Sequence, residues 1–171
     1  LDRLVARKFR GAAGGRLRLI VSGGASLDRQ VAKVMFVFGF NVVEGYGMTE
    51  ASPVIACNPI DAIRIGTVGT PLPGVDVRIG PSDEILVRGP NVMKGYLNRP
   101  EETAEALDED GWLHTGDQGA LDPDGYLSIT GRLKDLIVTS YGKNISPRPI
   151  EERLARSDYI AQVMVYGDDR K

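Results

Sequence analysis

The sequence predicts an α/β fold class made of three parts: the end of a parallel α/β subdomain, a small antiparallel β subdomain, and the start of a small α+β domain. Helical and strand-like segments alternate over the first fifty residues, whereas short strand-like runs separated by turn residues follow. Alternating strands and helices favour a parallel sheet, and short strands joined by tight turns favour an antiparallel one. The predicted boundaries are 1–64, 65–131 and 132–171.

The first two elements are a helix and a strand. Apolar residues recur at helical spacing over residues 1–10, and glycines from Gly11 onward are expected to break this helix. The β-branched, apolar run at residues 17–21 is typical of a buried strand. The strand leads directly into a glycine-rich loop.

A second helix and a second strand follow. Apolar residues at helical spacing predict a helix over residues 27–38, with Ser26 as its N-cap and Gly39 as its stop. Residues 41–44 predict a strand that ends in another glycine-rich loop, residues 45–47. Because ligands of open α/β sheets gather at the C-terminal ends of strands, both loops are candidate binding elements.

The middle of the chain predicts a β unit. Apolar and polar residues alternate over 75–79 and 85–88, as in antiparallel strands. Residues 100–107 predict a short helix with Pro100 in its first turn. Residues 122–125 have the composition of a tight turn between two further strands.

The last forty residues predict a hairpin, a helix and a strand. The apolar run 136–139 and Ile145 flank a polar loop, which indicates the hairpin. Pro149 is predicted to start the helix. Residues 161–165 alternate apolar and polar side chains, which predicts the strand.

Composition excludes several classes of protein. Among 171 residues, 42% are hydrophobic and 26% are charged, and the net charge is −2, so a nucleic-acid partner is not expected. Cys57 is the single cysteine, which forbids an internal disulfide, and it is expected to be a small, partly buried thiol. The single histidine, His114, excludes a metal site built on several histidines. No apolar run reaches the length of about eighteen residues that a membrane span needs.

Two glycine-containing segments carry candidate binding groups. Small residues at 22–26 lie between a strand and a helix, where a ligand can approach the backbone and anions are favoured; a turn without a ligand is equally consistent. Segment 45–50 offers the ring of Tyr46 to stack on a base, the Thr49 hydroxyl for a phosphate and the Glu50 carboxylate for Mg²⁺. A glycine turn with a partly buried tyrosine is the alternative.

Two later segments carry charged groups. Asp117 could accept hydrogen bonds from two vicinal hydroxyls such as those of a ribose, although an ordinary turn would also use an aspartate. His114 has no partner that the sequence identifies, so a structural role is expected. Arg132 and Lys134 could meet a nucleotide, and a solvated linker is the alternative.

Taken together and in order, these segments resemble the adenylate-forming superfamily, which contains acyl-CoA synthetases, peptide-synthetase adenylation domains and beetle luciferases. The segments GYGMTE, LIVTS and GKNISPRPIEE are most similar to bacterial long-chain fatty acyl-CoA synthetases. The similar stretches cover most of the chain: SGGASL at 22–27, GYGMTEAS at 45–52, GTVGTPLPG at 66–74, EILVRGPNVMKGYLNRPEET at 84–103, DGWLHTGD at 110–117 and DGYLSITGRLKDLIVTSYGKNISPRPIEE at 124–152.

The resemblance implies a role for each candidate residue in nucleotide binding. Ala25 and Tyr46, with Gly47 beside it, would hold the adenine. Asp117 and Arg132 would hold the ribose hydroxyls. The remaining nucleotide contacts that the resemblance implies are Thr49 with the α-phosphate and Glu50 with Mg²⁺.

The resemblance also implies roles in the acyl-transfer steps. Gly23 and Gly24 would lie beside the acyl group. Lys134 would be the hinge about which a small C-terminal domain rotates between two half-reactions, and Gly142 would approach the pantetheine arm of CoA. Lys134 is therefore expected to act with Thr49 and Glu50 in catalysis.

The implied activity is that of an ATP-dependent long-chain fatty acid–CoA ligase that uses ATP, Mg²⁺ and coenzyme A. The alternatives are a fatty acyl-AMP ligase, a ligase for an aryl or short-chain acid, and a non-catalytic nucleotide-binding module. The expected partners are fatty acid, ATP and CoA. A cytoplasmic location is expected, with peripheral contact at the inner membrane face left open.

Departures from the family pattern limit what the chain can do alone. The phosphate loop of the family would precede residue 22 and its catalytic lysine would follow residue 171, so we expect an internal fragment that forms no acyl adenylate by itself. Asp83 replaces a common Gly, which should only alter a turn. Tyr141 also replaces a common Gly, and it is expected either to narrow the CoA approach or to be neutral. An exposed cut face of the sheet would create a risk of self-association.

Overall fold

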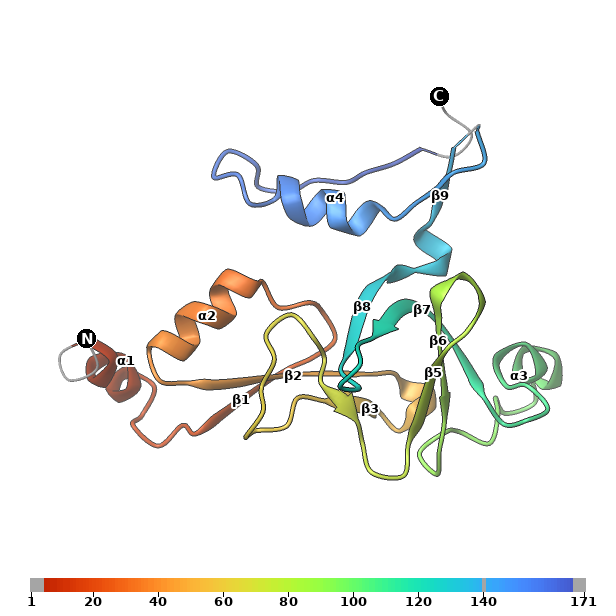
Figure 1. Cartoon of the computed structure of the whole chain (residues 1–171), viewed down its shortest axis with the longest axis horizontal. Helices are drawn as coiled ribbons and strands as arrows, with labels where there is room; N and C mark the ends of the chain where they lie inside the picture. Colours follow the sequence, from red (N-terminus) through yellow and green to blue (C-terminus); the bar gives the residue numbers. More distant parts are fainter. Residues whose placement is uncertain (1–4, 140, 168–171) are drawn as a thin grey trace.

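The computed structural model describes residues 5–139 and 141–167, and their strands form three sheets with the orders β1-β2-β3-β4, β5-β6-β7-β8 and β10-β9 (Figure 1). The mixed α/β architecture predicted from the sequence is confirmed. The elements are α1 (Arg7–Ala12), β1 (Leu19–Ser22), α2 (Arg29–Val37), β2 (Asn41–Gly47), η2 (Thr49–Ala51), β3 (Val54–Cys57), β4 (Thr70–Pro71), β5 (Asp76–Ile79), η3 (Pro81–Asp83), β6 (Glu84–Arg88), α3 (Pro100–Ala106), β7 (Leu113–Leu121), β8 (Leu127–Arg132), η4 (Leu133–Asp135), β9 (Ile137–Val138), β10 (Asn144–Ile145) and α4 (Pro147–Leu154).

The first sheet begins with the predicted parallel pair. β1 and β2 run side by side from the pair Leu19 and Asn41 to the pair Ser22 and Glu44. The glycine-rich loop expected at 45–47 is wrong, because these residues continue β2. They do so because β3 pairs antiparallel with them and supplies hydrogen-bond partners for their backbone. The sheet is therefore parallel at one edge and antiparallel beyond β2.

The start of α2 differs from the prediction. The N-cap is Asp28 rather than Ser26, and its carboxylate accepts hydrogen bonds from the backbone N–H groups of Gln30 (2.7 Å) and Val31 (3.1 Å). The Leu27 N–H donates to the Glu44 carboxylate of β2 at 3.3 Å, which keeps the chain against the sheet until Asp28. The helix therefore begins later than its apolar pattern suggested.

The glycine stops are partly as predicted. Gly39 follows α2 with a φ of 81°, a conformation that glycine adopts without strain. Gly11, by contrast, lies inside α1, and the chain leaves that helix at Gly14 and Gly15, which have φ of 82° and 69°. Residues 1–4 of the predicted first helix lie outside the described residues.

The second sheet is antiparallel throughout, as predicted, and shares a core with the first. The pairs β5–β6, β6–β7 and β7–β8 are all antiparallel. Leu127 of β8 ties the sheets together, because it accepts a hydrogen bond from the Val68 N–H and donates one to the Gly69 carbonyl, both 2.8 Å long. The fully buried core cluster contains Ala51, Ile55 and Ala56 from the first sheet region, and Ile85, Val87, Leu113 and Leu127 from the second.

Helix α3 and the turn at 122–125 form where predicted. Pro100 occupies the first turn of α3. In the turn, the Gly125 N–H donates to the Asp122 carbonyl at 2.9 Å. Arg64 reaches this turn from the first part of the chain, stacks on the Tyr126 ring at 3.9 Å and bonds the Asp122 carboxylate.

The C-terminal part contains the predicted hairpin and the predicted helix, but not the predicted strand. β9 and β10 pair antiparallel, as expected. Helix α4 begins at Pro147 rather than Pro149, since either proline fits a first helical turn. The strand predicted at residues 161–165 is wrong: no described strand lies beside them to accept their hydrogen bonds. Figure 1 shows α4 and the segment after it set apart from the two larger sheets.

None of the described helices is long and apolar enough to cross a membrane. Cys57 is a free, partly buried thiol, as expected from the sequence. The described residues contain no group of three or more His, Cys, Asp or Glu side chains placed to hold a metal ion.

Leu127→Ala is expected to lower the free energy of unfolding by about 2 to 5 kcal/mol, because it leaves a cavity in the core shared by the two sheets. Leu127 is 0% exposed, whereas the control residue Leu97 is 89% exposed. Urea unfolding of the two variants and the unaltered chain measures the difference. Equal losses for Leu127→Ala and Leu97→Ala would contradict the shared core.

Candidate functional site

A cavity of about 730 Å³ lies where the start of α2, strand β2, strand β8 and the α4 region meet. Its volume falls within the range of about 300 to 1,000 Å³ typical of small-molecule sites. It is lined by Gly24, Ala25, Ser26, Leu27, Asp28, Arg29, Gln30, Glu44, Gly45, Tyr46, Gly47, Gly66, Thr67, Val68, Asp117, Ile129, Arg132, Arg148, Ala155 and Arg156. Six of the predicted binding residues therefore line one cavity: Gly24, Ala25, Tyr46, Gly47, Asp117 and Arg132.

Three of these residues are in direct contact. The Tyr46 hydroxyl donates a hydrogen bond to Asp117 Oδ2 at 2.7 Å, across 71 residues of sequence. Arg132 Nε donates to Asp117 Oδ1 at 3.1 Å. The Asp117 side chain is 14% exposed and the Arg132 side chain 67% exposed, so the cation is the more solvent-exposed partner of this ion pair. Strands β2, β7 and β8 thus bring a ring, an anion and a cation together.

Burial and the neighbouring carboxylate keep the Tyr46 phenol protonated. Removal from water raises the pKa of Tyr46, and donation of its hydrogen bond to the negatively charged Asp117 raises it further. A hydrogen bond with Thr115 acts in the opposite direction and is outweighed. The phenol therefore serves as a stable hydrogen-bond donor that fixes Asp117.

Glycine at position 47 has a structural cause. A Cβ there would overlap the Pro53 carbonyl, since the backbone of the β2–β3 connection passes directly beside it. Gly24 instead needs its backbone freedom, having a φ of 80° with open space where a side chain would be. Gly24 thus places no side chain on its side of the cavity.

The N-terminus of α2 is already occupied by its own cap. The Asp28 carboxylate bonds the N–H groups of Val31 and Gln30, and these bonds lower the pKa of Asp28. Two of the donors that a bound anion would use are therefore taken. The anion affinity suggested for the loop before this helix does not come from these two N–H groups.

Other predicted site residues lie outside the cavity. Thr49 and Glu50 form η2 just past the end of β2, and the Glu50 carboxylate accepts a hydrogen bond from the Tyr96 hydroxyl at 2.8 Å. Gly23 lies beside the Gly45 carbonyl, which a Cβ at Gly23 would meet at 3.4 Å. None of these three residues therefore lines the cavity that contains the Tyr46–Asp117 contact.

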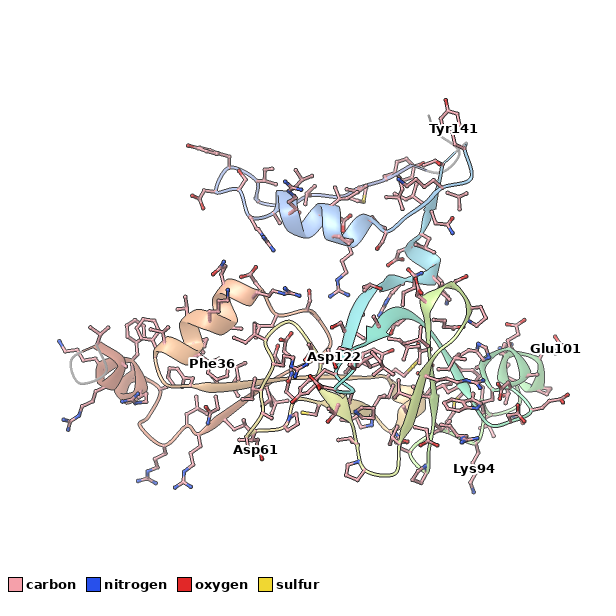
Figure 2. The ribbon with its side chains drawn as sticks, in the orientation of Figure 1. Phe36, Asp61, Lys94, Glu101, Asp122 and Tyr141 are labelled. Carbon is pink, nitrogen blue, oxygen red and sulfur yellow. The ribbon has the colours of Figure 1, made fainter. Side chains whose placement is uncertain are left out.

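Lys134 and Gly142 belong to the C-terminal part. Lys134 is exposed in η4, between β8 and β9. Gly142 lies in the turn of the β9–β10 hairpin with a φ of 74°, and its N–H donates to the Thr139 carbonyl at 2.8 Å. Tyr141 beside it is 84% exposed and points away from the rest of the molecule (Figure 2).

Sequence reasoning missed several groups near the site. Arg148 and Arg156 line the cavity from the α4 region, and Tyr96 contacts Glu50. His114 does have a carboxylate partner, because its Nδ1 lies 3.0 Å from Glu84 Oε2. The 30-residue separation of this pair left no local signal, and only the β6–β7 pairing could have revealed it.

Tyr46→Phe is expected to make the free energy of unfolding less sensitive to alkaline pH. The pKa of Tyr46 is higher in the folded chain than its ordinary value of about 10, so the folded state retains this proton longer. The contribution is complete below about pH 10 and is lost as pH rises toward the folded-state pKa. Urea unfolding from about pH 8 to pH 11 measures how steeply the free energy of unfolding changes with pH.

Tyr159→Phe is the matched control, because Tyr159 is 98% exposed. This variant should keep the slope of the unaltered chain. A Tyr46→Phe variant with that same slope would contradict the proton-holding role of the Tyr46–Asp117 contact.

Comparison with known proteins places this geometry in a family. The long-chain-fatty-acid–CoA ligase FadD15 of Mycobacterium bovis is 46% identical over 167 residues, which are 98% of this chain and 28% of the relative. The chain thus spans just over a quarter of that curated relative. ATP-bound MatB from Rhodopseudomonas palustris matches with a TM-score of 0.79 at 37% identity, over 88% of this chain and 32% of that structure.

A second solved structure gives a similar match. The o-succinylbenzoate CoA synthetase MenE from Bacillus subtilis, in complex with ATP and magnesium, has a TM-score of 0.77 at 34% identity, over 85% of this chain and 32% of that structure. The AMP-binding enzyme family matches residues 1–97, and the AMP-binding enzyme C-terminal domain matches residues 134–171. With more than half of its residues matched, the chain belongs to the AMP-binding enzyme family.

Proposed function

We propose that this chain is part of an ATP-dependent enzyme that converts a carboxylic acid into an acyl adenylate and then into an acyl-CoA thioester. The observation that carries the proposal is the cavity in which Tyr46, Asp117 and Arg132 meet, in a chain of the AMP-binding enzyme family. A nucleotide presents a flat base and two vicinal hydroxyls. The cavity offers a ring and a fixed carboxylate.

The Asp117 carboxylate fits a ribose. An ionised carboxylate can accept about four hydrogen bonds, and the contacts with Tyr46 and Arg132 use one on each oxygen. Each oxygen can therefore accept one more, from one of two adjacent hydroxyls. The Tyr46 ring is proposed to contact the adenine face, with Ala25 on its other side, as both residues line the cavity.

Thr49 and Glu50 are proposed to serve the phosphates at the end of β2. Mg²⁺ usually takes one or two protein carboxylates and fills its other positions with phosphate oxygens and water. A single carboxylate at Glu50 fits this pattern. The ion, when bound, would neutralise phosphate charge. The Tyr96 hydroxyl orients the Glu50 carboxylate through its 2.8 Å hydrogen bond.

The C-terminal part is proposed to change position between the two half-reactions. Lys134 lies in the short η4 segment between two β elements, where a few residues can absorb a rotation. Gly142 is proposed to approach the pantetheine arm after that rotation, and Gly23 and Gly24 to lie beside the acyl group. The exposure of Gly142 in the hairpin turn supports such an approach, because this residue itself adds no side chain and has open space around it.

A long-chain fatty acid is the proposed substrate. The relative named a long-chain-fatty-acid–CoA ligase is 46% identical over 98% of this chain, which supports this choice. The cytoplasmic location and the peripheral membrane contact remain predictions.

Full-length protein containing this chain is expected to catalyse ATP–pyrophosphate exchange driven by long-chain fatty acids. The 171-residue chain alone is expected to catalyse none, since most of the length of its relatives is outside it. A panel of long-chain, short-chain, malonic and aryl acids measures the preference. Exchange with none of these acids by a folded full-length protein would contradict the proposed function, and exchange by the chain alone would contradict the fragment interpretation.

Glu50→Gln in the full-length protein is expected to lower the exchange rate by at least about tenfold, with partial recovery at raised Mg²⁺, because the amide keeps the shape but not the charge. Glu101→Gln is the matched control, since Glu101 is exposed on α3 (Figure 2). If the Glu50→Gln and Glu101→Gln variants had the same exchange rate and the same dependence on Mg²⁺ concentration, the proposed role of Glu50 in binding Mg²⁺ would be contradicted.

A further inference from the structure

Asp117 is the last residue of an irregularity in β7. Glu84 of β6 pairs with Gln118, and Leu86 pairs with His114, so Ile85 alone lies opposite residues 115–117. Gly116 in this segment has a φ of 69°, a conformation that side-chain-bearing residues rarely adopt. The bulge formed by residues 115–117 re-aims the chain and brings Asp117 to the cavity.

The Glu84 carboxylate holds this bulge from behind with both of its oxygens. Oε1 accepts a hydrogen bond from the Gly116 N–H at 3.0 Å, and Oε2 lies 3.0 Å from His114 Nδ1. The Glu84 side chain is 12% exposed, which makes it one of the more buried charged groups described. It does not line the cavity.

A short chain of bonds links Glu84 to Asp117. The Thr115 hydroxyl donates to the Ile85 carbonyl at 2.7 Å and accepts from the Asp117 N–H at 3.1 Å. Glu84 thus fixes the backbone of Gly116, which lies between Thr115 and Asp117, and the Thr115 hydroxyl fixes the backbone of Asp117. Loss of the carboxylate would leave the Gly116 N–H without its acceptor and let the bulge relax.

We propose that Glu84 is a positioning residue for nucleotide binding, which acts through the 115–117 bulge by fixing the Asp117 carboxylate. The proposal rests on the proposed function, in which Asp117 accepts the ribose hydroxyls. A misplacement of about 1 Å in a group that orients a substrate can reduce its effect up to a hundredfold. Glu84 therefore belongs to the binding machinery although it touches no part of the cavity.

The test is AMP binding to the full-length protein, measured by calorimetry. Glu84→Ala is expected to raise the dissociation constant of AMP about tenfold, because it removes the charged acceptor of the Gly116 N–H hydrogen bond. Glu84→Gln should recover most of the affinity, because its amide oxygen can still accept from the Gly116 N–H. Asp83→Asn is the matched control, being exposed on the adjacent turn, and should bind AMP like the unaltered protein.

A double-variant cycle separates positioning from general destabilisation. If Glu84 acts through Asp117, Glu84→Ala should have little further effect on AMP affinity in an Asp117→Asn background, although it should still destabilise the fold there. An equal loss of affinity in both backgrounds would overturn the positioning role, as would AMP binding unchanged by Glu84→Ala. Absence of AMP binding by the unaltered protein would overturn the proposed function, and the positioning role with it.

Discussion

The docking of the β1–β4 sheet against the β5–β8 sheet is the constraint on which the site depends. Two backbone hydrogen bonds join Leu127 to Val68 and Gly69, and side chains of both sheets form a single buried cluster. This contact fixes β7 and β8 beside β2. Without it, Tyr46 and Asp117 would have no reason to meet across 71 residues, because a loop of that length is costly to close and has no local preference for one geometry.

The docking of the two sheets positions the Asp117 carboxylate to accept hydrogen bonds from a ligand. Removing an anion from water is unfavourable unless partners replace the lost hydration. The exposed Arg132 provides only a weak, solvent-screened attraction, so the more buried Tyr46 hydroxyl is the better partner. The carboxylate is thereby held in one orientation. Its remaining lone pairs therefore already point in fixed directions before a ligand binds. Such preorganisation lowers the entropic cost of binding a ligand.

The residues that shape the cavity are themselves held by acidic side chains in the surrounding strands and loops. Glu44 holds the loop after β1 through the Leu27 N–H, Asp28 caps α2, and Glu84 holds the 115–117 bulge. In all three cases a carboxylate accepts a hydrogen bond from a backbone N–H that the local chain would otherwise leave unpaired. Cavity walls built from irregular backbone need such acceptors, because neither a helix nor a sheet satisfies their N–H groups.

The sequence by itself determined the local elements and the chemical types of the site. Apolar periodicity and turn residues predicted the parallel β1–β2 pair, α3, the 122–125 turn and the antiparallel β5–β6 pair, since these depend on spacing within a few residues. The same spacing misplaced the N-cap of α2 and predicted a strand at 161–165, because a cap depends on where the sheet holds the chain and a strand depends on a neighbour to pair with.

The tertiary structure alone decided which candidates share a cavity. It joined Tyr46, Asp117 and Arg132, left Glu50 and Lys134 outside the lining of their cavity, and gave His114 its carboxylate partner. Side-chain contacts across 15 to 71 residues follow from strand pairing and sheet docking rather than from local pattern.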